Sequence, residues 1–286
     1  MPRPTPAASP ATGTDRTATT HGAVGRAVPG PFNARLDAAI DDTGSLLCVG
    51  LDPVVERIDQ PIADFCRRII DATQTAAVAF KPNSAFFEAL GPAGMADLVT
   101  VLRHVPDGRL MILDAKRGDI GSSAAAYARA VFRTLGADAV TVNPYLGGDA
   151  VAPFLADPAH GAFVLCHTSN PGAVDFQSLD VGGRPLYIEI ARRAVTWDAQ
   201  GNVGLVVGAT YPGALAAVRA EAPDLPFLVP GVGAQGGDLE EAVRAGRDVN
   251  ERGLVLSSSR GILYAGDPAT EAKKLRDAIN AARARG

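Results

Sequence analysis

The feature that most constrains this chain is a repeated alternation of short apolar runs and segments with helical periodicity. The apolar runs occupy residues 46–52, 78–83, 110–113, 139–144, 162–169, 203–210, 226–231 and 253–259. They are nearly continuous, which is typical of strands buried on both faces of a parallel sheet. Eight strand–helix units in about 255 residues match the count and size of a (β/α)₈ TIM barrel. A doubly wound open sheet is the structural alternative.

Residues 1–30 differ in composition from the rest of the chain. They are rich in Pro, Ala, Thr and Gly and show no apolar periodicity. Three arginines and one aspartate in this segment are weakly reminiscent of a transit peptide, but the composition favours a disordered tail. We therefore predict a disordered tail over residues 1–30 and a single (β/α)₈ catalytic domain over residues 31–286.

Composition excludes several classes of protein. The formal net charge is −4 and no basic stripe is visible, which argues against a nucleic-acid partner. No apolar run approaches the roughly 18 residues of a membrane span, so no membrane association is expected. The three cysteines are scattered and form no C-x-x-C pair, which predicts neither disulfides nor a zinc site and favours a reducing, cytoplasmic compartment.

The third apolar run ends in a cluster of charges, within L-M-I-L-D-A-K-R-G-D-I at residues 110–120. Side chains alternate along a strand, so Asp114 and Lys116 point the same way, and Asp119 follows where the chain turns toward a helix. Buried charges are costly unless they are paired. The cluster is therefore either a catalytic array or a structural ion network in which Asp119 caps the next helix.

Polar residues interrupt the apolar runs almost only at their C-terminal ends. In a (β/α)₈ barrel these ends carry the active site, and a purely structural set would have no reason to be so one-sided. The pattern therefore favours a catalytic site. The residues at these ends are Asp52, Lys81, Asp114, Lys116, Asp119, Asn143, Thr168, Ser169, Asn170, Thr210, Gln235, Ser259 and Arg260.

The last two units carry a separate pattern typical of phosphate binding. V-P-G-V-G-A-Q-G-G-D at residues 229–238 and S-S-S-R-G at residues 257–261 follow the seventh and eighth runs. Glycines let backbone N–H groups approach an anion, and Arg260 offers a fork of donors to phosphate oxygens. Tight turns with a surface arginine are the alternative. Although G-x-G-x-x-G occurs here, no acid follows about 20 residues later, so a dinucleotide site is not expected.

Taken together, these motifs resemble the orotidine 5′-phosphate decarboxylase family, in the forms of its bacterial subfamily that includes mycobacterial enzymes. F-K-P-N, D-A-K-R-G-D-I, S-N-P-G-A and V-P-G-V-G-A-Q-G-G-D carry the resemblance, which extends from about residue 31 to the end. It implies a cofactor-independent and metal-independent decarboxylase that converts orotidine 5′-monophosphate to uridine 5′-monophosphate and CO₂ in pyrimidine biosynthesis.

The resemblance also implies a role for each residue of a charged array. Lys81, Asp114, Lys116 and Asp119 form the array, with Lys116 donating a proton to C6 of the pyrimidine and Asp114 facing the substrate carboxylate. In the family, Asp119 reaches across a dimer interface together with the residues that follow it, here Ile120 and Ser123. A homodimer is therefore expected.

The remaining implied residues bind the nucleotide. Asp52 and Lys81 are expected to hold the ribose hydroxyls, Ser169 to bond the pyrimidine ring and Pro230 to line the base pocket. Gln235 and Arg260 are expected to bind the phosphate.

Two other functions stay open from the sequence. A magnesium-dependent phosphosugar decarboxylase or aldolase of the same barrel group shares D-x-K-x-x-D, but its second strand usually carries an acid where this chain has Lys81. A non-catalytic phosphate-binding barrel would have no use for the full charged array.

Overall fold

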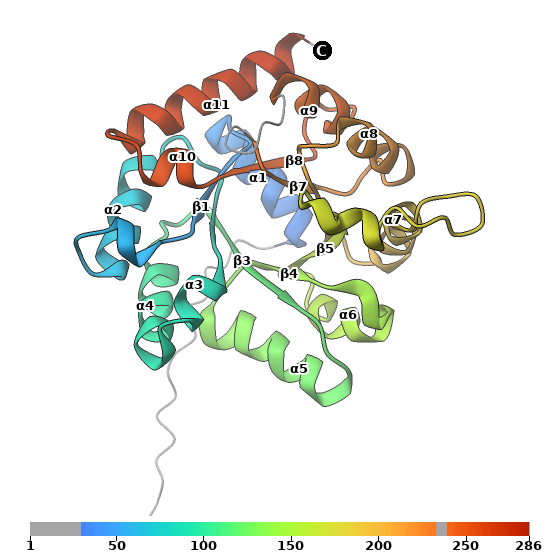
Figure 1. Cartoon of the computed structure of the whole chain (residues 1–286), viewed down its shortest axis with the longest axis horizontal. Coiled ribbons are helices and arrows are strands. Elements are labelled where there is room, and N and C mark those ends of the chain that lie inside the picture. The colour runs from blue at the N-terminus through green and yellow to red at the C-terminus, as the bar shows by residue number, and fades with distance from the viewer. Residues whose placement is uncertain (1–29, 233–238, 286) are drawn as a thin grey trace, which may run out of the picture.

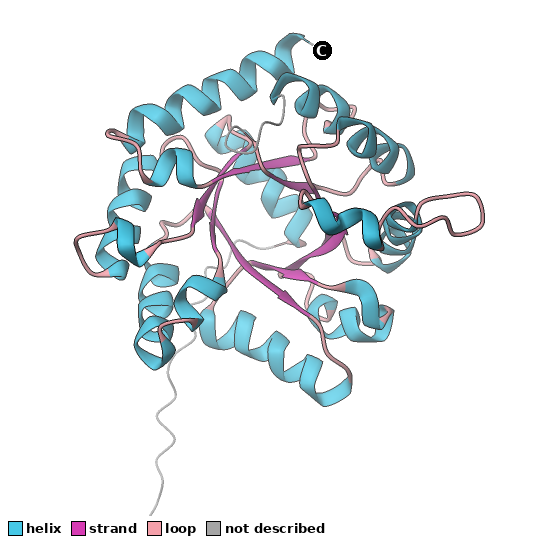
Figure 2. Cartoon of the chain, in the orientation of Figure 1, coloured by secondary structure: helices cyan, strands magenta, loops and turns pink. Residues whose placement is uncertain are grey.

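The structure, a computed structural model, describes residues 30–232 and 239–285. Its eight strands form a closed parallel barrel in chain order, with β1 paired to both β2 and β8. The predicted TIM barrel is therefore confirmed, and the open sheet is excluded. Figure 2 shows the ring of strands surrounded by helices. The strands are β1 Leu47–Leu51, β2 Ala79–Pro82, β3 Leu110–Arg117, β4 Ala139–Val142, β5 Gly161–His167, β6 Val203–Val207, β7 Phe227–Pro230 and β8 Leu254–Ser258.

Helices cover the outside of the barrel (Figure 1). They are α1 Phe32–Thr43, α2 Ile62–Thr73, α3 Ser84–Glu88, α4 Gly91–His104, α5 Gly121–Arg129, α6 Gly148–Leu155, α7 Leu186–Trp197, α8 Pro212–Glu221, α9 Leu239–Gly246, α10 Arg260–Leu263 and α11 Pro268–Arg285. Two local features add to the simple alternation of strands and helices. Asn83 caps an additional helix, α3, by accepting a hydrogen bond from the Ala85 N–H. A π-helical turn, Ala130–Leu135, continues α5.

Helix α1 closes the end of the barrel where the strands begin. The Phe32 ring packs edge-on against Phe163 of β5, with centroids 5.8 Å apart. Arg35 forms a buried ion pair with Asp138, which precedes β4, and donates to the Ala159 carbonyl over 2.6 Å. Figure 1 shows α1 behind the barrel, opposite the end at which the strands finish. Helix α1 therefore covers the amino ends of the strands, opposite their carboxyl ends.

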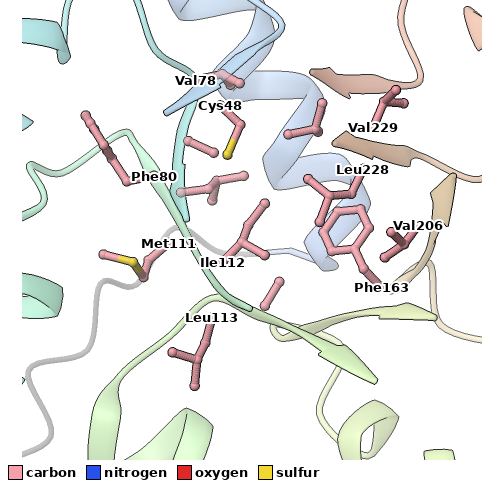
Figure 3. Close-up of a cluster of buried hydrophobic side chains, with 14 of the residues drawn as sticks. Cys48, Val78, Phe80, Met111, Ile112, Leu113, Phe163, Val206, Leu228 and Val229 are labelled. Carbon is pink, nitrogen blue, oxygen red and sulfur yellow. The ribbon is translucent and has the colours of Figure 1, made fainter. Parts of the chain in front are cut away.

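The interior is filled by large apolar side chains (Figure 3). Ile112 of β3 points into the barrel beside Phe163 and Leu228, all of them nearly or fully buried. Met111 and Leu113 lie on the other face of the same strand. Strand alternation then directs Asp114, two residues after Ile112, toward the barrel axis.

Two predictions concern residues at the limits of the described chain. The predicted disordered tail, residues 1–30, lies outside the described residues except for the exposed Gly30, and Gln235 lies outside them too. All three cysteines are described, and they are buried, free thiols. Within residues 30–232 and 239–285, no helix has the length and apolarity needed to cross a membrane.

Candidate active site

Two lysines and one aspartate meet at the carboxyl end of the barrel. Lys81 Nζ at the end of β2 donates to Asp114 Oδ2 over 2.9 Å, and Lys116 Nζ donates to Asp114 Oδ1 over 2.6 Å. Lys81 is 5% exposed, whereas half of the Lys116 side chain is accessible. The array therefore has a buried cation, a shared carboxylate and a second cation that can reach a ligand.

The backbone of β3 is irregular where it carries these charges. Leu113 pairs with Val140 and Arg117 with Val142, so residues 114–116 lie opposite the single residue Thr141. Such a bulge bends a strand and redirects its side chains. Lys116 takes φ +46°, a left-handed conformation that is uncommon for a residue other than glycine. The geometry of the D-x-K motif therefore depends on a distortion that strand periodicity does not predict.

The charges in the array stabilise one another. Burial acts to raise the pKa of the Asp114 carboxyl, but the ammonium groups of Lys81 and Lys116 outweigh it and hold this pKa well below its ordinary value. Burial also opposes the charge on Lys81, but Asp114 and Asp52 outweigh it and raise the Lys81 pKa. Asp114 is therefore an anion and Lys81 a cation across the physiological pH range.

Buried polar atoms without partners lie at other strand ends. Among the described residues, Asp52 Oδ1, Thr210 Oγ1 and Ser259 Oγ are buried and have no hydrogen-bond partner. They follow β1, β6 and β8 at the same end of the barrel as the charged array. Buried polar groups in proteins are almost always satisfied, so these atoms indicate a site built for a polar ligand or ordered water.

Three described residues that were predicted to contact the ring or the phosphate lie at the same end: Ser169, Pro230 and Arg260. Ser169 follows β5 and packs closely against Gly208, which follows β6. A Cβ added at Gly208 would lie only 2.9 Å from the Ser169 backbone nitrogen. Pro230 ends β7, and its carbonyl accepts from the Ala209 N–H over 3.0 Å. Arg260 is exposed at the start of α10, directly after β8. These three residues thus surround the barrel mouth.

Asp119 does not take part in the hydrogen bonds of the array. Its Oδ1 accepts from the N–H of the next residue, Ile120, over 2.8 Å. No hydrogen bond or ion pair joins it to Lys81 or Lys116 in the described part of the chain. Ile120 is 60% exposed, and Ser123 is exposed on α5. Asp119, Ile120 and Ser123 thus share no hydrogen bond or ion pair with Lys81, Asp114 or Lys116 in the described part of the chain.

Thr141 is a site residue that the sequence analysis did not single out. Its hydroxyl donates to Asp114 Oδ1 over 3.0 Å, although the residue lies inside the fourth apolar run. Thr141 is the one polar residue among the four residues of β4, and this could have drawn attention to it in the sequence. Histidine, cysteine, aspartate and glutamate nowhere gather in groups of three able to hold a metal ion, as far as the described residues show.

A sequence model of the orotidine 5′-phosphate decarboxylase / HUMPS family matches residues 45–275. The chain belongs to this family. The match spans β1 to α11 and therefore includes every strand end described above.

Relatives of the chain within the decarboxylase family are similar over nearly their full length. An orotidine 5′-phosphate decarboxylase of Roseiflexus castenholzii is 52% identical over 267 residues, which are 88% of this chain and 98% of the relative. One from Thermomicrobium roseum is 52% identical over 262 residues, covering 88% and 93%. The solved structure of Leishmania donovani OMP decarboxylase aligns with a TM-score of 0.83 and 47% identity, covering 88% of this chain and 98% of that one.

Proposed function

We propose that the protein is an orotidine 5′-phosphate decarboxylase, which converts orotidine 5′-monophosphate to uridine 5′-monophosphate and CO₂ in pyrimidine biosynthesis. The observation that carries this proposal is the Lys81–Asp114–Lys116 array at the barrel mouth. Relatives at 52% identity that bear this name support it.

The array suits a decarboxylation that has no electron sink. When the bond between C6 and the carboxylate breaks, the electron pair stays on C6 and CO₂ departs. The accessible Lys116 ammonium stabilises this carbanion and then delivers a proton to C6. The ionised Asp114 lies beside the substrate carboxylate, and their repulsion falls as CO₂ leaves.

The other strand ends would orient the nucleotide. Asp52 and Lys81 would hold the ribose hydroxyls, and the unpartnered Asp52 Oδ1 supports this role. Ser169 and Pro230 would contact the base. Arg260, together with Gln235, would bind the phosphate, whose binding energy far from C6 can be used to orient the reacting carbon.

The test of the activity is direct. Purified protein in EDTA is expected to consume orotidine 5′-monophosphate, and the loss of substrate absorbance measures this consumption. One equivalent of uridine 5′-monophosphate should be released. Absence of turnover would contradict the activity. A requirement for magnesium with a ketose phosphate as substrate would instead favour the phosphosugar branch of the family. The buried Lys81, paired with Asp114, argues against that branch, since it stands where an acid would be needed for the metal.

We infer that the enzyme is a homodimer in which Asp119 completes the partner's site. Exposed apolar side chains follow β3, β4 and β5, and larger exposed apolar patches mark interaction surfaces. Tyr145 and Phe176 also line a common cavity of about 670 Å³ with Leu186, which shows that two of these segments adjoin. The exposed side chains are Ile120, Tyr145, Leu146, Val174, Phe176 and Leu179.

Mixed dimers test this arrangement. Asp119→Ala and Lys116→Ala are each expected to be inactive alone, while a mixture re-equilibrated from monomers forms heterodimers with one intact site. If association is random, half the dimers are heterodimers, so activity returns to about a quarter of the wild-type value. If Asp119 acts in its own subunit, mixing restores no activity.

We also propose a cytoplasmic location. All three thiols are buried and free, and the chain therefore depends on no disulfide. Fractionation of the source cells with an antibody to the protein would test this, and recovery outside the cytoplasmic fraction would contradict it.

A further inference from the structure

Thr141 faces the bulge of β3 from the middle of β4. Its side chain is buried, at 2% exposure, so it cannot be reached by a ligand directly. The three residues 114–116 of β3 lie opposite this one residue. Any group that holds the bulge in shape therefore also determines where the charged side chains of β3 point.

The Thr141 hydroxyl makes three hydrogen bonds at this position. Its Oγ1 accepts from the backbone N–H of Ala115 over 3.1 Å and from that of Lys116 over 2.9 Å. It donates to Asp114 Oδ1 over 3.0 Å. A hydroxyl has one donor and two lone pairs, so its full hydrogen-bonding capacity is used within the D-x-K motif.

These bonds hold three otherwise adaptable features. The N–H groups of Ala115 and Lys116 would be out of register with the β4 backbone, and the hydroxyl accepts both. Lys116 has φ +46°, a conformation that costs free energy unless its surroundings support it. Asp114 Oδ1 accepts hydrogen bonds from both the Thr141 hydroxyl and Lys116 Nζ. The hydroxyl therefore also orients the carboxylate that positions the Lys116 ammonium.

We propose that Thr141 is a positioning residue for the reaction, acting through its hydroxyl on the Asp114 carboxylate and the Lys116 backbone. This inference rests on the proposed decarboxylase function. A proton donor must be held close to the reacting carbon, and a misplacement of about 1 Å can cost about a hundredfold in rate.

Thr141→Val tests the proposal, because it keeps the shape of the side chain and removes the hydroxyl. We expect kcat to fall by about a hundredfold while KM and the affinity for uridine 5′-monophosphate change by less than about threefold. Thr141→Ser keeps the hydroxyl and is expected to restore kcat to within about threefold of the wild type.

Thr73→Val is the matched control. Thr73 is fully buried in α2 and its hydroxyl donates to the Ile69 carbonyl over 2.7 Å, so this change also removes one buried hydroxyl. It is expected to lower Tm without changing kcat. If Thr141→Val does not fold, Thr141→Ala provides the same test with less bulk on β4.

Three results would overturn the inference. One is a Thr141→Val or Thr141→Ala enzyme with kcat within about threefold of the wild type. Another is Thr141→Ser as slow as Thr141→Val. The last is a crystal structure of Thr141→Val in which Asp114 and Lys116 keep their positions. Absence of orotidylate turnover in the wild type would instead contradict the proposed function, so the two failures are distinguishable.

Discussion

Lys81 and Asp114 form an ion pair at the barrel mouth, with Nζ 2.9 Å from Oδ2 and both side chains largely shielded from water. The pair joins the ends of β2 and β3. Because the second carboxylate oxygen of Asp114 contacts Lys116, the buried lysine helps to orient the accessible one through a shared anion.

Lys116→Ala should remove the proton donor. We expect a loss of at least about 4 kcal/mol of transition-state stabilisation, roughly a thousandfold in kcat/KM. Initial rates of orotidylate consumption provide the measurement. Lys274→Ala removes an exposed lysine of α11 and should leave kcat/KM unchanged. A near-wild-type rate for Lys116→Ala would exclude the proposed mechanism.

Lys81→Met should destabilise the fold as well as abolish activity. It leaves Asp114 without its buried partner, and breaking a buried ion pair from one side costs about 3–5 kcal/mol. Urea unfolding at pH 7 measures the change in free energy of unfolding, with an exposed-lysine substitution, Lys273→Met, as the control. A free energy of unfolding equal to that of the wild type would show that Lys116 alone is enough to stabilise the negative charge of Asp114.

The contribution of Asp114 to stability should depend on pH in one direction. The folded-state pKa of Asp114 lies below its unfolded value of about 3.9, so its ionised form stabilises the fold above that pH. The stability difference between wild type and Asp114→Asn should therefore be constant above about pH 5 and decrease as the pH falls below about 4. Unfolding curves from pH 7 to pH 3 provide the measurement; a difference that grows toward low pH would contradict the depressed pKa.

Gly50→Ala should impair phosphate binding. A Cβ at this position of β1 would lie 2.8 Å from the Ser259 Cβ and 3.4 Å from its Cα, so the chain that leads into Arg260 must shift. We expect KM to rise by about tenfold or more, with a smaller effect on kcat. Gly213→Ala in α8 is the control, because its added Cβ meets nothing within 4 Å. An unchanged KM would show that the position of the Ser259–Arg260 segment does not affect phosphate binding.

Much of this protein could be predicted from the order of its residues. Short, nearly continuous apolar runs are typical of strands buried on both faces of a parallel sheet, so eight of them separated by helices predicted the barrel. The polar residues that end the runs then predicted which end of the barrel carries the site. Alternation along β3 predicted that Asp114 and Lys116 point the same way, and their side chains do form a hydrogen bond, although they do so on a bulge that the local period does not contain.

The tertiary structure decided what local periods do not contain. The bulge that gives Lys116 a positive φ depends on the pairing of β3 with β4, and Thr141 became part of the site only because the two strands are neighbours. The contact between Lys81 and Asp114 likewise joins residues 33 positions apart. Asp119, in the turn after β3, bonds the backbone of Ile120 rather than either lysine. Sequence patterns specify which face a residue occupies, whereas distances between charges depend on how separate strands register in space.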